Sequence, residues 1–405
     1  MNLQISPVEP PLRLLVVNPL LAGSKLAISE IMAGSVFGYN RYIDLILLVY
    51  CNEISLAEQF KMELRGCAFA NCNNIVVSSD LPSLSDADVF MFISNFKNPN
   101  RIDYTNLHDE RHFDTMYLIL KVATNLTASL ADNEIKEEEK TKRKKNIPEK
   151  KKEKPVIVAD GLITLYILRE VCKDLPSDIL FCPTPVPVVV RSVLADYLKT
   201  ELTKFNHVHA WAADDEIFHF EIEKPLIKSD TLEESRACGK EVMGNETLEL
   251  YGFDYLQLCD NWLKTELREK VVSRLGKNPY GSIFRASEIV RILQYIWKPR
   301  ITNGLQLYIN LGVISDGSLG SLKGLPCVLP LIIEGENWNV NKYFDRDSYM
   351  RTEMKRINIR VKHILEKFTP YCRKFMEDNV VQKNFVPAEE DMMTMSDTTT
   401  RTTEV

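Results

Sequence analysis

The chain has 405 residues, of which 45% are hydrophobic and 26% are charged, a composition typical of folded globular proteins. This composition excludes a largely disordered or repeat-built chain, and the length predicts two domains of ordinary size. The net charge of −6 gives no basis for nucleic-acid binding by the whole chain, so no nucleic-acid partner is expected.

The sequence predicts a cytoplasmic location. Its longest apolar runs, 43–51 and 325–333, are far shorter than the roughly 18 residues that cross a bilayer, so no membrane association is expected. Nine scattered cysteines without a CxxC pair favour a reducing compartment. Residues 1–4 do not begin an apolar signal segment.

Short apolar runs alternate with helical patterns over the first 200 residues. This alternation is typical of βαβ units and a parallel sheet. It predicts an α/β fold class with a doubly wound parallel sheet in a first domain of residues 1–186. The expected strands are 12–17, 43–49, 74–77, 89–93, 156–159 and 179–182, and the expected helices are 24–32, 55–65, 163–172 and 188–198.

A charged segment interrupts this first domain at residues 132–154. It holds ten basic and seven acidic side chains in 23 residues, and such a segment cannot bury apolar surface. We expect a solvated insertion, or alternatively a docking arm for an acidic partner. Its net charge of only +3 weakens the case for phosphate binding.

The pattern changes after residue 186 to that of an α+β domain, residues 187–379. Strands at 207–213 and 217–222 read as a hairpin around Asp214-Asp215-Glu216. Residues 380–405 have no periodicity and are expected to be a disordered tail. The other expected elements are helices at 248–275, 282–297 and 346–379 and strands at 307–313 and 328–333.

Six short stretches share their order and spacing with a known family. They are 14–17 (LLVV), 33–38 (AGSVFG), 62–69 (MELRGCAF), 86–89 (DADV), 295–297 (YIW) and 311–317 (LGVISDG). Over most of residues 12–378 the chain resembles cytosolic-type malate dehydrogenase, of the lactate/malate dehydrogenase superfamily. The resemblance implies a Rossmann-like domain followed by a malate dehydrogenase-like α+β domain, and a homodimer. These stretches indicate the fold. They do not indicate an activity, which depends on the residues at each matched site position.

The positions that match the family's dinucleotide site are changed. The resemblance places the two turn glycines at Asn18 and Leu21 and the ribose-binding Asp at Val49. Because a glycine-rich turn lets the backbone approach a pyrophosphate, leucine in that turn is an obstruction. The family's Asn-Pro pair beside the nicotinamide is replaced by Asp160-Gly161. No bound cofactor is therefore expected, and Leu20, Leu21 and Val49 are expected to fill the cleft where the dinucleotide would lie. NAD is the alternative.

The substrate-binding arginines of the family are also missing. The matched positions carry Asn98, Tyr104 and Val190, none of which offers the planar fork that binds a carboxylate bidentately. Arg101 and Arg191 stand nearby and are possible substitutes.

The proton-transfer pair is lost as well. The family's catalytic His matches Asp214, and the Asp that orients this His matches Pro187. Loss of a general acid alone typically lowers the rate by about 10²–10⁴. Because several independent elements fail together, no catalytic residue is expected to be intact.

The remaining histidines and acids give no metal site. His108 and His112 are spaced for metal binding on a helix but lack the HExxH order, so an exposed helix face is expected. His207 and His209 have no third ligand nearby and are expected to be structural. The segment 214–216 is interpreted as a solvated turn, with a cation site as the alternative.

The partners expected are a second copy of the chain and a protein bound through the insertion or through Thr403-Glu404-Val405, which fits the C-terminal pattern of PDZ grooves. The resemblance to divergent animal paralogues of malate dehydrogenase implies an axonemal or ciliary association.

The leading hypothesis is a catalytically inactive, malate dehydrogenase-like pseudoenzyme with a structural or interaction role. The first alternative is an NAD-dependent malate dehydrogenase, in which Arg101, Arg191 and Asp214 converge on one pocket. The second alternative is a ligand-sensing pseudoenzyme with a remodelled cleft.

Overall fold

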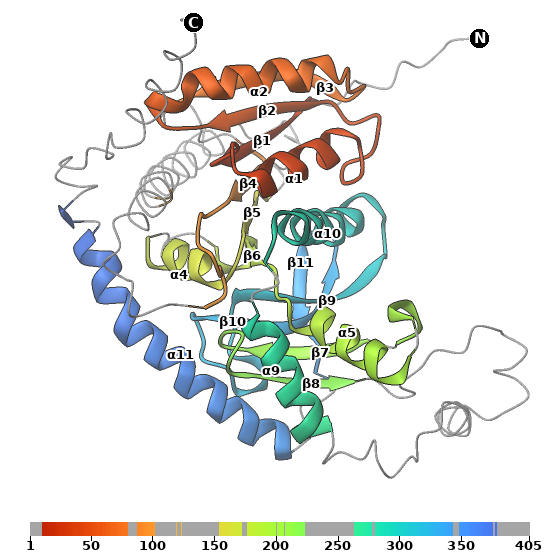
Figure 1. Cartoon of the computed structure of the whole chain (residues 1–405), viewed down its shortest axis with the longest axis vertical. Helices are drawn as coiled ribbons and strands as arrows, with labels where there is room; N and C mark the ends of the chain where they lie inside the picture. The colour runs from red at the N-terminus through yellow and green to blue at the C-terminus, as the bar shows by residue number, and fades with distance from the viewer. Residues whose placement is uncertain are drawn as a thin grey trace, which may run out of the picture.

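The computed structural model describes residues 10–79, 87–101, 154–171, 176–199, 201–205, 207–222, 263–277, 280–342 and 348–375, together with positions 119, 123, 377 and 378. One 11-stranded sheet runs through them in the order β3-β2-β1-β4-β5-β6-β9-β10-β7-β8, and β11 pairs with β10 (Figure 1). The sheet is parallel as far as β6 and antiparallel beyond it. The predicted α/β fold class is confirmed.

The parallel strands are mostly continuous apolar runs, because helices cover both of their faces. Leu14 of β1 pairs with Leu45 of β2 on one side and with Val89 of β4 on the other, so the strand order changes direction at β1. The bounds are β1 Leu12–Val17, β2 Ile43–Leu48, β3 Cys72–Ser78, β4 Val89–Phe92, β5 Val156–Ala159 and β6 Leu180–Cys182.

The antiparallel part continues from the sixth strand without a break. Cys182 of β6 pairs with Gly312 of β9, and a Cβ added at Gly312 would lie 2.3 Å from the Cys182 Sγ. Only glycine fits at this position of the sheet. The bounds are β7 Val208–Ala212, β8 Phe218–Ile222, β9 Gln306–Ile314, β10 Pro326–Glu334 and β11 Asn337–Val340.

Seven α-helices lie within the described residues. α1 and α2 flank the strands β1 and β2, and α11 runs along the antiparallel part (Figure 1). The first turn of α5 contains Pro187, at a position where a missing N–H breaks no helical hydrogen bond. Their bounds are α1 Ala22–Met32, α2 Ile54–Gly66, α4 Leu162–Val171, α5 Val186–Leu198, α9 Arg268–Gly276, α10 Ser282–Ile301 and α11 Ser348–Phe375.

Helix α10 joins the two parts of the molecule by packing against α1. At Gly23 of α1, an added Cβ would lie 3.4 Å from the Ser282 carbonyl oxygen and 3.5 Å from the Arg285 Cβ. Farther along, the rings of Phe37 and Trp297 meet edge to face with centroids 4.8 Å apart. This packing brings the N-terminus of α10 to the N-terminus of α1.

The predicted elements agree with the structure to within a few residues, with two main differences. Helix α10 extends to Ile301, beyond the predicted end at 297 and through Pro299. The strand β11 was not predicted, because Asn-Trp-Asn-Val is short and polar. The predicted domain boundary at 186 coincides with the first residue of α5 and stays a prediction.

Several predicted segments lie outside the described residues. They are residues 132–153 of the insertion, residues 248–262 of the predicted 248–275 helix and the 380–405 tail. Within the described part of the chain, no helix combines the length and apolar character needed to cross a membrane.

Candidate functional site

The candidate site is the edge of the sheet where β1, β4 and β5 end. In doubly wound sheets, ligands bind at the carboxyl ends of the strands where the strand order changes direction. Here that place lies between β1 and β4. Asn18 follows β1, Ser94 lies just after β4, and Asp160 follows β5.

Asn18 takes the backbone conformation expected of a turn glycine. Its φ is 58°, in the left-handed region that asparagine tolerates better than most residues. Its Nδ2 donates to the Ile93 carbonyl at 2.7 Å. The side chain therefore ties the end of β1 to the end of β4.

Apolar side chains line the adjoining turn. Val49, at the end of β2, is buried with 1% exposure, and its N–H donates to the Ser78 carbonyl at 3.0 Å. Leu20 and Leu21 are half-buried and pack against the core. At the start of α1, the buried hydroxyl of Ser24 has no hydrogen-bond partner within the described part of the chain.

Asp160 is buried and its carboxylate is fully engaged. Oδ2 accepts from the Ser94 N–H at 2.9 Å and from the Ser94 hydroxyl at 2.6 Å. Oδ1 accepts from the Thr164 hydroxyl at 2.7 Å, and the Arg285 Nη1 lies 3.7 Å from Oδ2. Asp160 thus joins the end of β4 to the first turn of α4.

Arg285 of α10 reaches into this edge and was not predicted as a site residue. Its Nη1 donates to the Ser94 carbonyl at 3.3 Å, and its Nη2 donates to the carbonyls of Phe96 and Lys97, the latter at 3.0 Å. Its Nε donates to the Tyr280 carbonyl at 3.0 Å. The only sequence signal was a basic residue beside the buried stripe of a helix.

Gly161 permits a close approach of the 97–101 segment. A Cβ added at Gly161 would lie 2.5 Å from the Pro99 carbonyl oxygen. That oxygen accepts from the Ile163 N–H at 2.9 Å, and Asn100 Oδ1 accepts from the Leu162 N–H at 3.1 Å. The N-terminus of α4 is therefore capped by the chain's own loop.

The hairpin tip between β7 and β8 is buried, so the prediction of a solvated turn was wrong. Asp214 is 3% exposed; its Oδ1 accepts from the backbone N–H groups of Glu216 and Ile217. Its Oδ2 accepts from the Arg360 Nε at 2.6 Å. The partner that allows this carboxylate to be buried comes from α11, which local sequence does not reveal.

Asp215 is buried beside it, and its two oxygens differ in their contacts. Oδ2 accepts from the Asn98 Nδ2 at 2.9 Å and from the Tyr280 hydroxyl at 2.8 Å, while Oδ1 finds no hydrogen-bond partner among the residues that the structure describes. Burial raises the pKa of the Asp215 carboxyl, and the hydrogen bonds from Asn98 and Tyr280 act in the opposite direction. Burial also raises the pKa of the Tyr280 hydroxyl well above its usual value.

The two substitute arginines lie in different clusters. Arg101 pairs with Glu216 at 2.7 Å, and Glu216 also pairs with Arg360, the partner of Asp214. Arg191 instead lies on α5, where its Nε donates to the Pro187 carbonyl at 3.5 Å.

Two charged residues of α10 lie near the Arg191 guanidinium and affect its pKa. Burial lowers the pKa of its guanidinium, and Arg291 adds to this effect while Glu288 opposes it. Val190, next to it, is completely buried. The structure therefore brings Arg101 and Asp214 together but does not join Arg191 to them. Tyr104 lies outside the described residues.

Among the described residues, no group of three or more His, Cys, Asp or Glu side chains is arranged to hold a metal ion. His207 is exposed and His209 is buried on β7. His108 and His112 lie outside the described residues.

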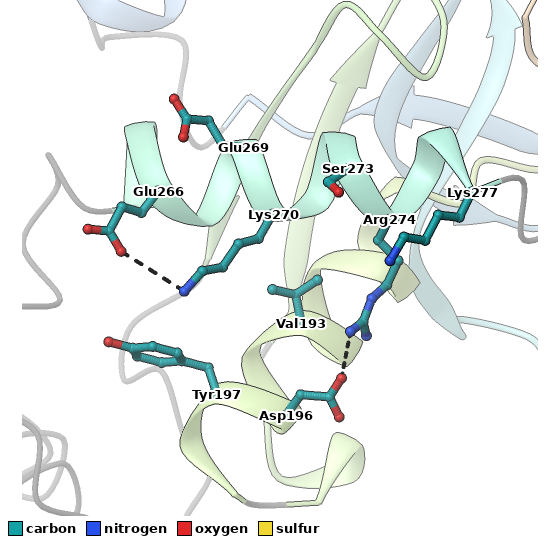
Figure 2. Close-up of a pocket in the computed structure, with 9 residues that line it drawn as sticks. All are labelled: Val193, Asp196, Tyr197, Glu266, Glu269, Lys270, Ser273, Arg274 and Lys277. Atoms are coloured by element: carbon teal, nitrogen blue, oxygen red, sulfur yellow. Dashed lines mark ion pairs between the residues drawn. The ribbon is translucent and has the colours of Figure 1, made fainter.

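A surface hollow of about 650 Å³ lies between α5 and α9, away from the sheet edge (Figure 2). Its three basic side chains, Lys270, Arg274 and Lys277, face three acidic ones, so the lining carries no net charge. Arg274 pairs with Asp196 at 2.7 Å, and Lys270 pairs more loosely with Glu266 at 4.0 Å. The hollow offers no charge preference for a ligand.

Neither the models of known protein families nor the curated protein sequences give a match to this chain. Solved structures do match it. Malate dehydrogenase from Naegleria fowleri has a TM-score of 0.63 at 14% identity, covering 91% of this chain and 99% of that one. Trichomonas vaginalis lactate dehydrogenase, solved with NADH and oxamate, matches with a TM-score of 0.61 at 12% identity, and the match again covers 91% of this chain and 99% of that one. Malate dehydrogenase from Aeropyrum pernix matches with a TM-score of 0.58 at 10% identity, covering 89% of this chain and 100% of that one.

These similarities extend over nearly the whole length of the solved proteins, but the identities are too low to transfer an activity. The TM-scores of 0.58 to 0.63 over about nine-tenths of this chain show the same overall architecture. The chain therefore has the malate/lactate dehydrogenase fold, as the sequence resemblance implied.

Proposed function

We propose that this protein is a catalytically inactive member of the dehydrogenase fold with a structural or interaction role. The observation that carries the proposal is Arg285, whose guanidinium bonds the chain's own carbonyls at the edge where a dinucleotide would lie. A ligand at that edge would have to displace these bonds.

The residues at the matched dinucleotide positions do not fit NAD. Val49 has no side-chain group to accept a hydrogen bond from a ribose hydroxyl. Leu21 places a branched side chain at the start of α1, where a pyrophosphate needs open backbone. The absence of a bound cofactor therefore stays our expectation.

The matched proton-donor position is equally unsuited. Asp214 accepts hydrogen bonds from two backbone N–H groups and from Arg360, so both of its oxygens are occupied by donors of the chain itself. A general acid must instead lie within hydrogen-bond reach of the substrate atom that receives its proton. Pro187, at the position of the orienting Asp, has no side-chain acceptor.

An interaction role is supported by apolar surface on the face formed by α1 and α10. A hollow of about 410 Å³ there is lined by Leu26, Phe69, Ile283 and Ala286 among others, and Ile283 is 76% exposed. Such a surface favours protein association. We propose that it forms a homodimer contact. Partners of the insertion and of the C-terminal residues, and a cytoplasmic or ciliary location, stay predictions from the sequence.

Calorimetric titration of the full chain with NADH, followed by an oxaloacetate-reduction assay, tests the proposal. An active malate dehydrogenase handled in parallel is the control for the reagents. We expect neither heat of binding nor turnover. Micromolar binding with turnover would establish the NAD-dependent alternative, which the φ of Asn18 favours. Binding without turnover would establish a ligand sensor.

A further inference from the structure

The segment of residues 94–101 that follows β4, here named the strap, is anchored to five other parts of the fold. Its anchors are the Asp160 carboxylate after β5, the Arg285 guanidinium on α10, the Asp215 carboxylate at the β7–β8 tip, the N-terminus of α4, and Glu216 beside the tip. Each anchor bonds a different residue or set of residues of the strap. The strap is thus fixed along its whole length by protein groups.

Arg285 makes more of these bonds than any other anchor described above. It donates to three strap carbonyls, those of Ser94, Phe96 and Lys97, from a side chain that is only 15% exposed. A guanidinium offers five donors in a fixed planar fork, which a lysine ammonium does not reproduce. The stem of Arg285 packs beside Gly23 of α1, because its Cβ lies 3.5 Å from the ideal Cβ position at Gly23, an ordinary van der Waals distance.

The far end of the strap caps α4. The Leu162 N–H donates to the Asn100 side chain and the Ile163 N–H to the Pro99 carbonyl, so two N-terminal donors of α4 depend on the strap for their partners. If the strap lifted away, both amides would lose these partners. The amide protons of Leu162 and Ile163 therefore report directly on strap closure.

We propose that the strap is a permanently closed lid over the carboxyl edge of the sheet, with Arg285 as the residue that locks it. The closure requires no ligand, because every anchor is a group of the chain itself. This inference does not rest on the proposed function, since a closed strap and the loss of catalysis are separate properties with separate measurements.

Hydrogen–deuterium exchange of the full chain without nucleotide tests the proposal. In the wild type, peptides that contain residues 94–101 and the 162–163 amides should exchange slowly. Arg285→Ala removes three charge-assisted hydrogen bonds to the strap and should speed the exchange of these peptides by at least roughly a hundredfold, since losing one such bond alone corresponds to roughly tenfold to a hundredfold. Arg291→Ala is the matched control, because Arg291 lies on the same helix but pairs with Glu288 of that helix. It should leave the exchange unchanged.

Fast exchange of the strap in the wild type would overturn the proposal, as would unchanged exchange in Arg285→Ala. Should Arg285→Ala not fold, Arg285→Lys retains a positive charge without the planar fork and should speed exchange at the same peptides. Equal protection in Arg285→Lys and the wild type would show that the fork is not the lock. NADH turnover, measured separately, decides the proposed function and does not affect this result.

Discussion

Asp160 and Ser94 are joined twice, because both the backbone N–H and the hydroxyl of Ser94 donate to Asp160 Oδ2. The other oxygen, Oδ1, accepts from Thr164. This buried carboxylate therefore organises the ends of β4 and β5 as a structural group, at an edge where dehydrogenase-fold proteins bind their ligands.

Asp160→Ala should lower the free energy of unfolding by about 3 kcal/mol. It leaves buried donors of Ser94 and Thr164 without partners, each at a cost of about 1–3 kcal/mol. Urea unfolding followed by circular dichroism measures the change. Ser94→Ala, which removes only one donor, is the control and should cost about 1 kcal/mol. If Asp160→Ala lost less stability than Ser94→Ala, the carboxylate would be dispensable for the fold.

Asp215→Asn should remove a pH dependence of stability. The pKa of Asp215 is raised in the folded state, so its ionisation opposes folding as the pH rises from about 4 through the raised value. The stability of Asp215→Asn relative to the wild type should therefore increase over that interval and then level off. Urea unfolding at a series of pH values measures it. A difference that decreases with rising pH would contradict the assignment.

Arg360→Ala should destabilise the hairpin tip. It leaves Asp214 buried without its cationic partner, a loss of about 3–5 kcal/mol for fully buried pairs. Because Arg360 is 21% exposed, we expect about 2–3 kcal/mol. Thermal unfolding should show the loss.

The matched control for Arg360→Ala is Lys61→Ala, which breaks a pair whose glutamate is 44% exposed and should cost below about 1 kcal/mol. Equal effects in the two variants would rule out a special role for the α11 contact with the tip.

Ile283→Glu should convert the proposed dimer to a monomer. It places a charge in the hollow between α1 and α10, where burial against a second copy would be costly. Sedimentation velocity at micromolar concentration measures the change. Ile359→Glu, at an exposed position on α11, is the control and should leave the sedimentation coefficient unaltered. A wild type that sediments as a monomer would end the dimer proposal.

Most of the sheet was predictable because its strands carry a local signal. The apolar runs at β1, β2, β4 and β5 are buried on both faces, so they stand out in the sequence. Short polar strands such as β11 lack that signal. The resemblance also implied the dehydrogenase fold, which residue patterns alone leave open.

The candidate site was less predictable because its side chains meet across long sequence distances. The matched positions Asn18 and Val49 could be named from the sequence, and the conformation of Asn18 agrees with a turn position. The burial of Asp214 depends on Arg360, 146 residues later. Arg285 reaches Ser94 across 191 residues. No local pattern encodes such pairings.

The contact between Cys182 and Gly312 carries a mechanical consequence. Since β6 and β9 are hydrogen-bonded there, the parallel and antiparallel parts form one continuous sheet from β3 to β8. A hinge at this seam would have to break backbone hydrogen bonds and separate tightly packed atoms. Force applied at one edge of the sheet is therefore transmitted to the other edge through the backbone hydrogen bonds between successive strands.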